Sequence, residues 1–365
     1  MSSSNSTPTA SKRKAPADEP SSSSTLTSAF TPRTKRRALS DLNGYAIFTW
    51  GQTRTAAHTA NADGSHNNTD DDDDERFPVF VEALQGEKVQ TISCARSGSE
   101  SGYVLTMDQK LKPWGPKVGG WASVKHRHRK VAKEPLVNGA VSQVASGFDH
   151  HACIIAESGD LLTWGNAEFG KLGHSFADDA PIVSVPQRVD ALEGIPIQQV
   201  ACGTFHTVAL ARSGEVYSFG WNEDGLTGHG ATEGNQLTPK RVEGLAHVSV
   251  KSIAAFGCYT LVLTTDGKVY SWGCGESDEK PFIDSASPRL VERIQHVRIV
   301  QISVGLSHVL ALSEKGMVYT WGMSPIHNVV VSEPSLVPDL QGIVRIDCSG
   351  AASFAVSERG VLYSW

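Results

Sequence analysis

The sequence predicts an all-β fold of the β-propeller type, and two regularities support this prediction. A string of two short apolar runs around a turn, "FHTVALARSGEVYSFG" from Phe205, recurs with variations at His150, Tyr259, Ser307 and Ser353. In each copy a turn glycine lies five residues before an aromatic residue, and another glycine opens the copy ten to twelve residues before the turn. The opening glycines are 45 to 56 residues apart, a period typical of solenoids and propellers.

Three kinds of repeated position define the copies. The opening glycines are Gly147, Gly203, Gly257, Gly305 and Gly350; the turn glycines are Gly159, Gly214, Gly267, Gly316 and Gly360; the aromatic ends are Trp164, Phe219, Trp272, Trp321 and Trp365. A histidine follows the opening glycine at His150, His206 and His308, and we expect Thr260 and Ser353 to replace it in the other copies. Because these residues recur at one place in successive copies, we interpret them as structural rather than catalytic.

Each copy is expected to hold about four short strands. Val208–Leu210 and Val216–Phe219 have the length and the β-branched or aromatic side chains of strands, and Gly214 between them can take a positive φ, so the pair predicts a β-hairpin. A further apolar segment, such as "PIQQVAC" before Gly203, precedes each opening glycine. Such a unit cannot bury its apolar face alone, whereas units arranged radially cover one another.

The copies nearest the N-terminus are incomplete. Trp114 ends a copy that has lost its turn glycine, and Ile47–Trp50 resembles the last strand of a copy whose beginning is missing. Six copies have an aromatic-ended strand, at Trp114, Trp164, Phe219, Trp272, Trp321 and Trp365. We therefore expect a propeller of about seven blades, six of them recognisable, with a gap or partial blade at the seam beside Tyr45–Trp50.

A closed ring of six blades, in which the Phe48 strand pairs with Leu362–Trp365, is the alternative. An open seam exposes unpaired backbone and apolar side chains. The chain is therefore expected to be less stable than one extended by half a repeat, and a truncated gene product is our interpretation of this end.

Residues 1–43 differ in composition from residues 44–365, which form the expected propeller. Ser, Thr and Pro dominate the first segment, which predicts a disordered tail. Two basic clusters lie in this tail, Lys12, Arg13 and Lys14, then Arg33, Lys35, Arg36 and Arg37. Such clusters resemble nuclear import signals and can also contact nucleic-acid phosphates without sequence specificity.

An acidic insertion is expected at about residues 53–77. Its five successive aspartates, Asp70–Asp74, repel one another and favour a solvated loop. A loop of this charge could also attract a basic partner such as a histone tail.

Several classes of function lack their sequence signals. No apolar run reaches the roughly 18 residues of a membrane-spanning helix, so no membrane contact is expected. The six cysteines form no C-x-x-C pair or zinc-type spacing, and no phosphate-binding or dinucleotide loop occurs, so neither a metal nor another cofactor is expected. No nucleophile stands with a base and an orienting group. We expect a non-enzymatic protein.

The repeated string, followed by the N-x-x-G-x-L-G-like element Asn166–Gly173, resembles the repeat of the regulator of chromosome condensation family over Tyr45–Trp365. The resemblance implies a seven-bladed propeller after a basic tail, chromatin binding, and nucleotide exchange on the small GTPase Ran through an acidic residue on one face. Asp149, immediately before His150, is similar in position to that acidic residue.

Two functions remain open at this point. The first is a nuclear protein-interaction propeller, with chromatin association and histones as expected partners and the cytoplasm as the alternative location. The second is a guanine nucleotide exchange factor for a Ran-like small GTPase. Degenerate repeats and the absence of a wedge-like insertion after Asp149 favour the first function.

We predict that the two basic clusters of the tail direct nuclear entry. Replacing the residues of Lys12–Lys14 and the basic residues of Arg33–Arg37 with alanine should leave a fluorescent fusion in the cytoplasm, because importin recognition of such motifs depends on their charge. Imaging of the double-cluster variant beside the parent tests this. An unchanged nuclear signal would contradict the prediction.

Overall fold

The computed structural model describes residues 48–51, 75–80, 88–94, 102–115, 130–131, 136–175, 182–230, 232, 234–274, 284–324, 329–350 and 352–365. A compact unit spans Ser40–Trp365. The basic clusters of residues 12–14 and 33–37 and the aspartates of residues 70–74 lie outside the described residues. The expected acidic insertion ends earlier than its sequence suggested, because Glu75–Phe77 already belong to a strand.

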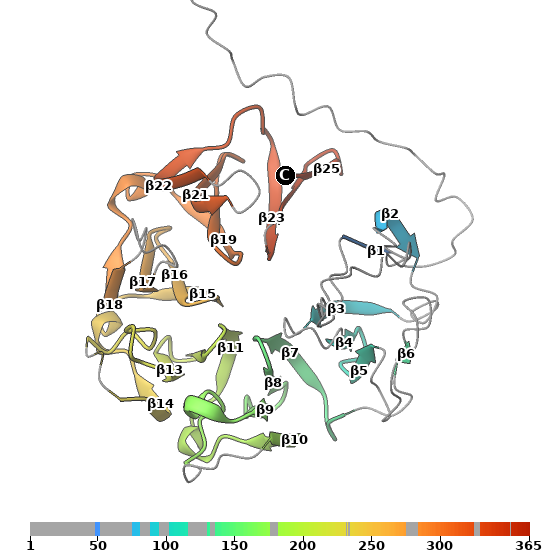
Figure 1. Ribbon diagram of the computed structural model, residues 1–365, viewed down its shortest axis with the longest axis vertical. Coiled ribbons are helices and arrows are strands. Elements are labelled where there is room, and N and C mark those ends of the chain that lie inside the picture. The colour runs from blue at the N-terminus through green and yellow to red at the C-terminus, as the bar shows by residue number, and fades with distance from the viewer. Residues whose placement is uncertain are drawn as a thin grey trace, which may run out of the picture. The chain divides into compact units, whose positions relative to one another are not determined.

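Within the compact unit, antiparallel sheets follow one another around a common centre (Figure 1). The described strands form five sheets of four strands, one of three and one of two. The four-stranded sheets contain β3 (Val89–Cys94), β4 (Gly102–Thr106), β5 (Leu111–Gly115) and β6 (Lys130–Val131); β7 (Val141–Ser146), β8 (His150–Ile155), β9 (Leu161–Asn166) and β10 (Ile182–Arg188); β11 (Ile197–Cys202), β12 (His206–Ala211), β13 (Val216–Gly220) and β14 (Gln236–Arg241); β15 (Val250–Phe256), β16 (Tyr259–Thr264), β17 (Val269–Cys274) and β18 (Asp284–Leu290); β19 (Ile299–Val304), β20 (His308–Ser313), β21 (Val318–Ser324) and β22 (Val329–Leu336). The three-stranded sheet contains β23 (Ile343–Ser349), β24 (Ala352–Ser357) and β25 (Leu362–Ser364), and the two-stranded sheet contains β1 (Phe48–Gly51) and β2 (Glu75–Phe80).

This arrangement confirms the propeller prediction, with six recognisable blades and an incomplete sheet at the seam. Strand β1 pairs with β2, with Phe48 opposite Phe80, and β25 pairs with β24. The alternative pairing of the Phe48 strand with Leu362–Trp365 is therefore not the one observed. At three of the junctions between successive sheets a short 3₁₀ turn inserts a buried aliphatic residue into the core; these turns are η4 (Asp190–Leu192), η5 (Glu243–Leu245) and η6 (Glu292–Ile294).

The core lies between neighbouring sheets, and each strand alternates its side chains between two of them. In β12, Val208 and Leu210 pack with Trp272 and other residues of the next sheet. The smaller Ala209 and Ala211 of the same strand point the other way and pack with the preceding sheet. One strand thus contributes larger side chains to one interface and smaller ones to the other, and both interfaces are closely packed.

Glutamines fasten the innermost strands of neighbouring sheets to one another. The side-chain amide of Gln199 in β11 donates to the carbonyl of Ile253 at 2.9 Å and accepts from the amide of Ile253 at 2.9 Å. Gln143 in β7 bonds Val200 in the same two-way manner, at 3.1 and 2.9 Å. The same pair of bonds joins Gln301 in β19 to Ile346 in β23, at 2.8 and 3.1 Å. Each glutamine therefore satisfies both backbone groups of one residue in the next sheet.

The outermost strands carry a proline in each of four sheets. These prolines are Pro186 in β10, Pro239 in β14, Pro288 in β18 and Pro334 in β22. Proline has no backbone N–H, so it cannot donate to a further strand, and edge strands are where it is tolerated. The proline positions therefore protect the exposed sheet edges against pairing with another chain.

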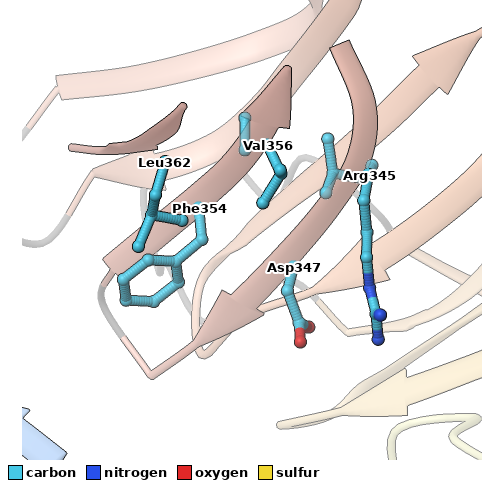
Figure 2. Close-up of a pocket in the computed structure, with 7 residues that line it drawn as sticks. Arg345, Asp347, Phe354, Val356 and Leu362 are labelled. Carbon is cyan, nitrogen blue, oxygen red and sulfur yellow. The ribbon is translucent and has the colours of Figure 1, made fainter. Parts of the chain in front are cut away.

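The face of the last sheet, β23–β25, forms an open hollow (Figure 2). Arg345 stands at the third position of β23, where β7, β11 and β19 have their glutamines. The registers equate Phe354, Val356 and Leu362 with Val208, Leu210 and Val216 of the β11–β14 sheet. There these side chains are covered by the next sheet, whereas Leu362 is 48% exposed.

The turn glycines of the hairpins adopt positive φ, between 72° and 94°. In the β4–β5 hairpin, which lacks a glycine, Gln109 stands five residues before Trp114 and takes the same conformation with φ 63°. This left-handed backbone costs a residue with a Cβ roughly 1–2 kcal/mol, and glycine avoids that steric cost.

We predict that Gln109→Gly raises the free energy of unfolding by about 0.5–1 kcal/mol, because the removed steric cost exceeds the added entropy of the unfolded chain. The matched control is Gly214→Gln, which places the same side chain at φ 94° in a site where an added Cβ would have no atom within 4 Å. This control should destabilise by about 1 kcal/mol. Urea unfolding gives the free energy of unfolding of both variants relative to the parent. A Gln109→Gly variant less stable than the parent would contradict the prediction.

Candidate interaction face around Asp149

In the β7–β10, β11–β14, β15–β18 and β19–β22 sheets (Figure 1), the turns between the innermost and second strands lie on one side of the propeller, here called the opening-turn face. In the β7–β10 sheet this turn contains Phe148 and Asp149, and in the β11–β14 sheet it contains Phe205. Because the strands are antiparallel, the ends of the third strands return to the same side. Asn166, the last residue of β9, and Trp221, which directly follows β13, therefore also lie at the opening-turn face.

Buried histidines beneath this face link neighbouring sheets. His150 Nε2 lies 3.1 Å from Thr207 Oγ1, His206 Nε2 lies 2.8 Å from Thr260 Oγ1, and His308 Nε2 lies 3.0 Å from Ser353 Oγ. Burial lowers the pKa of all three imidazoles, that of His206 to about 4 and that of His150 well below its usual range. These neutral rings and their buried hydroxyl partners have no access to a substrate, so the arrangement is structural.

The histidine position in the other two copies differs from the sequence expectation. Strand register places Tyr259 and Ala352 at the position of His206, and Thr260 and Ser353 at that of Thr207. Thr260 and Ser353 are thus hydrogen-bond partners of the preceding histidines rather than substitutes for a histidine. Tyr259 instead donates its hydroxyl to the carbonyl of Gly305 at 3.1 Å.

The same register corrects the equivalence of the opening glycines. A Cβ on Gly203 would lie 2.3 Å from His206 Cε1, and Gly147 and Gly305 contact their histidines in the same way. In the two copies without histidine this register position holds Phe256 and Ser349, and the glycines at positions 257 and 350 come one residue later with φ of 57° and 53°. Glycine is therefore required beneath a histidine ring for space and elsewhere for backbone conformation.

Asp149 is held by a buried lysine. The Nζ of Lys171 lies 2.7 Å from Asp149 Oδ1; the lysine side chain is 1% exposed and the aspartate 27%. Lys171 follows Gly170 as Leu226 follows Gly225, and Leu226 is an ordinary buried apolar residue. A buried ammonium group is costly unless it is paired, so the Lys171–Asp149 ion pair fixes both side chains.

Three aromatic residues, Phe169, Phe205 and Trp221, contact one another beside this ion pair and are here called the aromatic cluster. Phe169 and Phe205 have ring centres 5.8 Å apart, and Phe205 and Trp221 5.1 Å, both edge to face; Phe169 and Trp221 are 6.1 Å apart. Lys171 Nζ lies 5.9 Å from the centre of the Phe169 ring. The ion pair and the aromatic cluster are therefore contiguous.

The sequence located some of these residues and missed others. It singled out Asp149, but neither its partner Lys171 nor the aromatic cluster. The available signal was a lysine directly after Gly170, where the next copy has Leu226. Of the aromatic ends of the repeats, Trp164, Phe219, Trp272 and Trp321 are buried in the core, whereas Trp365 is only partly buried. The candidates for nuclear import lie outside the described residues.

The described residues contain no group of three or more His, Cys, Asp or Glu side chains placed to hold a metal ion. Nor do they contain a helix with the length and apolar character needed to cross a membrane.

We predict that Asp149→Asn lowers the free energy of unfolding by about 2 kcal/mol, because it leaves the buried Lys171 ammonium without a counter-charge. Lys171→Met places an apolar side chain where the next copy has Leu226, and it should lower the free energy of unfolding by less than Asp149→Asn does. The double variant should be more stable than Asp149→Asn alone, with a coupling energy of about 1–2 kcal/mol. A double-mutant cycle by urea unfolding measures this coupling, and strictly additive effects would contradict it.

Comparison with known proteins places the repeats in a family. A family model described as "Regulator of chromosome condensation (RCC1) repeat" matches residues 158–210 and 213–263. A second model of the same description matches residues 141–171, 197–226, 250–278 and 299–325.

Two relatives are similar in sequence over about half of the chain. The ultraviolet-B receptor UVR8 of Arabidopsis thaliana is 32% identical over 199 residues, which make up 54% of this chain and 43% of the receptor. The E3 ubiquitin-protein ligase HERC2 of Homo sapiens is 32% identical over 211 residues, 55% of this chain and 4% of the ligase. The chain thus spans less than half the length of either relative.

Solved structures share the fold. Human WBSCR16 has a TM-score of 0.67 and 23% identity over 80% of this chain and 79% of its own. Prp20p of Saccharomyces cerevisiae, a protein studied for its binding to Gsp1p and histones, has a TM-score of 0.61 and 20% identity over 78% of this chain and 74% of its own. The family-model matches and the repeated hairpins of the propeller together show that the chain carries repeats of the regulator of chromosome condensation (RCC1) family over residues 141–278 and 299–325.

Proposed function

We propose that the chain is a non-enzymatic protein-interaction module that presents its opening-turn face to a protein partner. The observation that carries this proposal is the Lys171–Asp149 ion pair, which holds a partly exposed carboxylate at a fixed position on that face. Side chains fixed before binding lose little entropy when a partner docks, which favours recognition. The strands beneath supply the rigid support.

Known family members support the proposal that the partner is another protein. Prp20p has been characterised for binding to Gsp1p and histones, and one further structure contains Kap60 bound to yeast RCC1 (Prp20). Nuclear location and chromatin association follow for this chain as parts of the proposal, supported by the basic clusters of its first 43 residues.

Nucleotide exchange on a Ran-like GTPase is the second candidate, favoured by the place of Asp149 on the opening-turn face. An exchange factor stabilises the nucleotide-free GTPase through contacts that compete with those of the nucleotide and its metal ion. The Asp149 charge is largely balanced by Lys171 within the chain, so it is less available for such competition. This balance is our reason for ranking simple interaction above exchange.

The test combines a pull-down with an exchange assay. Immobilised full-length protein is offered nucleotide-free Ran, GTP-loaded Ran and core histones, and release of a fluorescent GDP analogue from Ran is followed in parallel. We expect capture of one of these proteins without faster nucleotide release. Failure to bind any of the three would overturn the interaction proposal for these partners, and accelerated release would establish the exchange function instead.

Asp149→Asn combined with Lys171→Met is the informative variant, because it removes the surface carboxylate without leaving a buried ammonium unpaired. Asp149→Asn alone would mix loss of the carboxylate with loss of stability. If Asp149 contributes to the contact, the double variant should capture less partner while unfolding near the parent's midpoint. Equal capture by parent and double variant would exclude Asp149 from the interface.

A further inference from the structure

We propose that the aromatic cluster is the anchor for a protein segment that presents an arginine or lysine beside an apolar side chain. This inference rests on the proposed function, because it names the contact and the partner chemistry on the same opening-turn face. Three observations carry it: the backbone strain at Phe169, the direct contact of the three rings, and the charges around them.

Phe169 has a backbone conformation that favours glycine. Its φ is 62° and its ψ 8°, inside the three-residue turn η3 (Glu168–Gly170). A bulky residue in this left-handed region costs on the order of 1–3 kcal/mol. Glycine at this position would remove that cost without disturbing the turn. The phenylalanine is therefore retained at the expense of stability.

Core packing does not explain the retained ring. The side chain of Phe169 is 40% exposed, and Phe205 and Trp221 beside it are only partly buried. Strained residues that persist without a core role are most often found at binding sites, where the strain positions a side chain for a partner. Exposed aromatic side chains fixed in this way are typical anchors of protein interfaces.

The geometry of the rings limits what they can bind. Their centres are 5.1 to 6.1 Å apart, so the rings touch and leave no cavity between them for a ligand. The aromatic cluster therefore offers an outer apolar surface rather than an enclosed pocket. Such a surface takes an apolar side chain against the rings and a flat cation over a ring face.

The charges beside the cluster favour a cation. Along the segments that carry the three rings and Asp149, residues 147–150, 166–173, 204–206 and 221–225, the carboxylates are Asp149, Glu168, Glu223 and Asp224. The only ammonium of these segments, that of Lys171, is buried and already paired with Asp149. Glu168, Glu223 and Asp224 are exposed. A partner arginine or lysine at the rings would thus meet an uncompensated negative rim.

The experiment measures binding of two short fluorescent peptides by anisotropy to the full chain. One alternates leucine and glycine with arginine, and the other has glutamate in place of each arginine. We expect binding of the arginine peptide that weakens with added salt, and no comparable binding of the glutamate peptide. Equal affinity for both peptides would overturn the charge complementarity.

Phe169→Gly tests the anchor itself. The change removes the ring and relieves the positive φ, so the variant should be at least as stable as the parent while its affinity for the arginine peptide falls about tenfold. Gln109→Gly is the matched control, because it relieves the same backbone strain on another sheet and should leave peptide affinity unchanged. Unchanged affinity in Phe169→Gly would overturn the proposal.

The outcomes separate this inference from the proposed function. If Phe169→Gly still captures the parent's protein partner and binds the peptide as the parent does, the anchor is wrong while the interaction module stands. If the parent captures no protein in the pull-down, the proposed function fails for the proteins offered, whatever the peptide does. A Phe169→Gly variant much less stable than the parent would contradict the inferred strain.

Discussion

The hydrogen bonds that cross from one innermost strand to the next are the interaction on which the rest of the propeller depends. Apolar packing between sheets is non-directional and would tolerate sliding of one sheet along its neighbour. Gln199 removes that freedom, because its side-chain amide bonds both backbone groups of a single residue, Ile253. The histidines add a second bond near the opening turns. Each joint that has both residues is therefore fixed at two points, and this keeps the loops of the opening-turn face in register.

That rigid support explains how the face can carry groups that are unfavourable in isolation. A lysine buried to 1% exposure and a phenylalanine in a left-handed turn both cost free energy, and both lie within three residues of one another. The two features are connected, since the Lys171 ammonium lies near both Asp149 and the Phe169 ring. The stability of the underlying sheets therefore offsets the cost of holding Lys171 and Phe169 in fixed positions at the opening-turn face.

The repeat pattern predicted the hairpins and the incomplete seam, because those features follow from local spacing of glycine and apolar residues. It misplaced the histidine equivalents at Thr260 and Ser353, since counting from the opening glycine cannot reveal that this glycine is shifted by one residue in those copies. Asp149 was found because it adjoins a repeated histidine. Lys171 was missed because its partner Asp149 lies in a different turn of the same sheet, and Phe169 because its ring contacts Phe205 and Trp221 of the next sheet; no spacing along one strand encodes either contact.

The joints without a glutamine differ from the others in their expected response to temperature; β3 has Thr91 and β15 has Ser252 at the glutamine position. Between the β15–β18 and β19–β22 sheets the glutamine position holds Ser252, so the two amide bonds of the glutamine joints are absent. The hydroxyl of Tyr259 still donates to the Gly305 carbonyl across this joint, beside apolar packing that includes Ile302, Val309 and Trp321. Apolar association weakens on cooling, whereas hydrogen bonds do not share that dependence. This joint therefore depends more on apolar packing than the glutamine joints do, and we expect it to lose more of its stability on cooling.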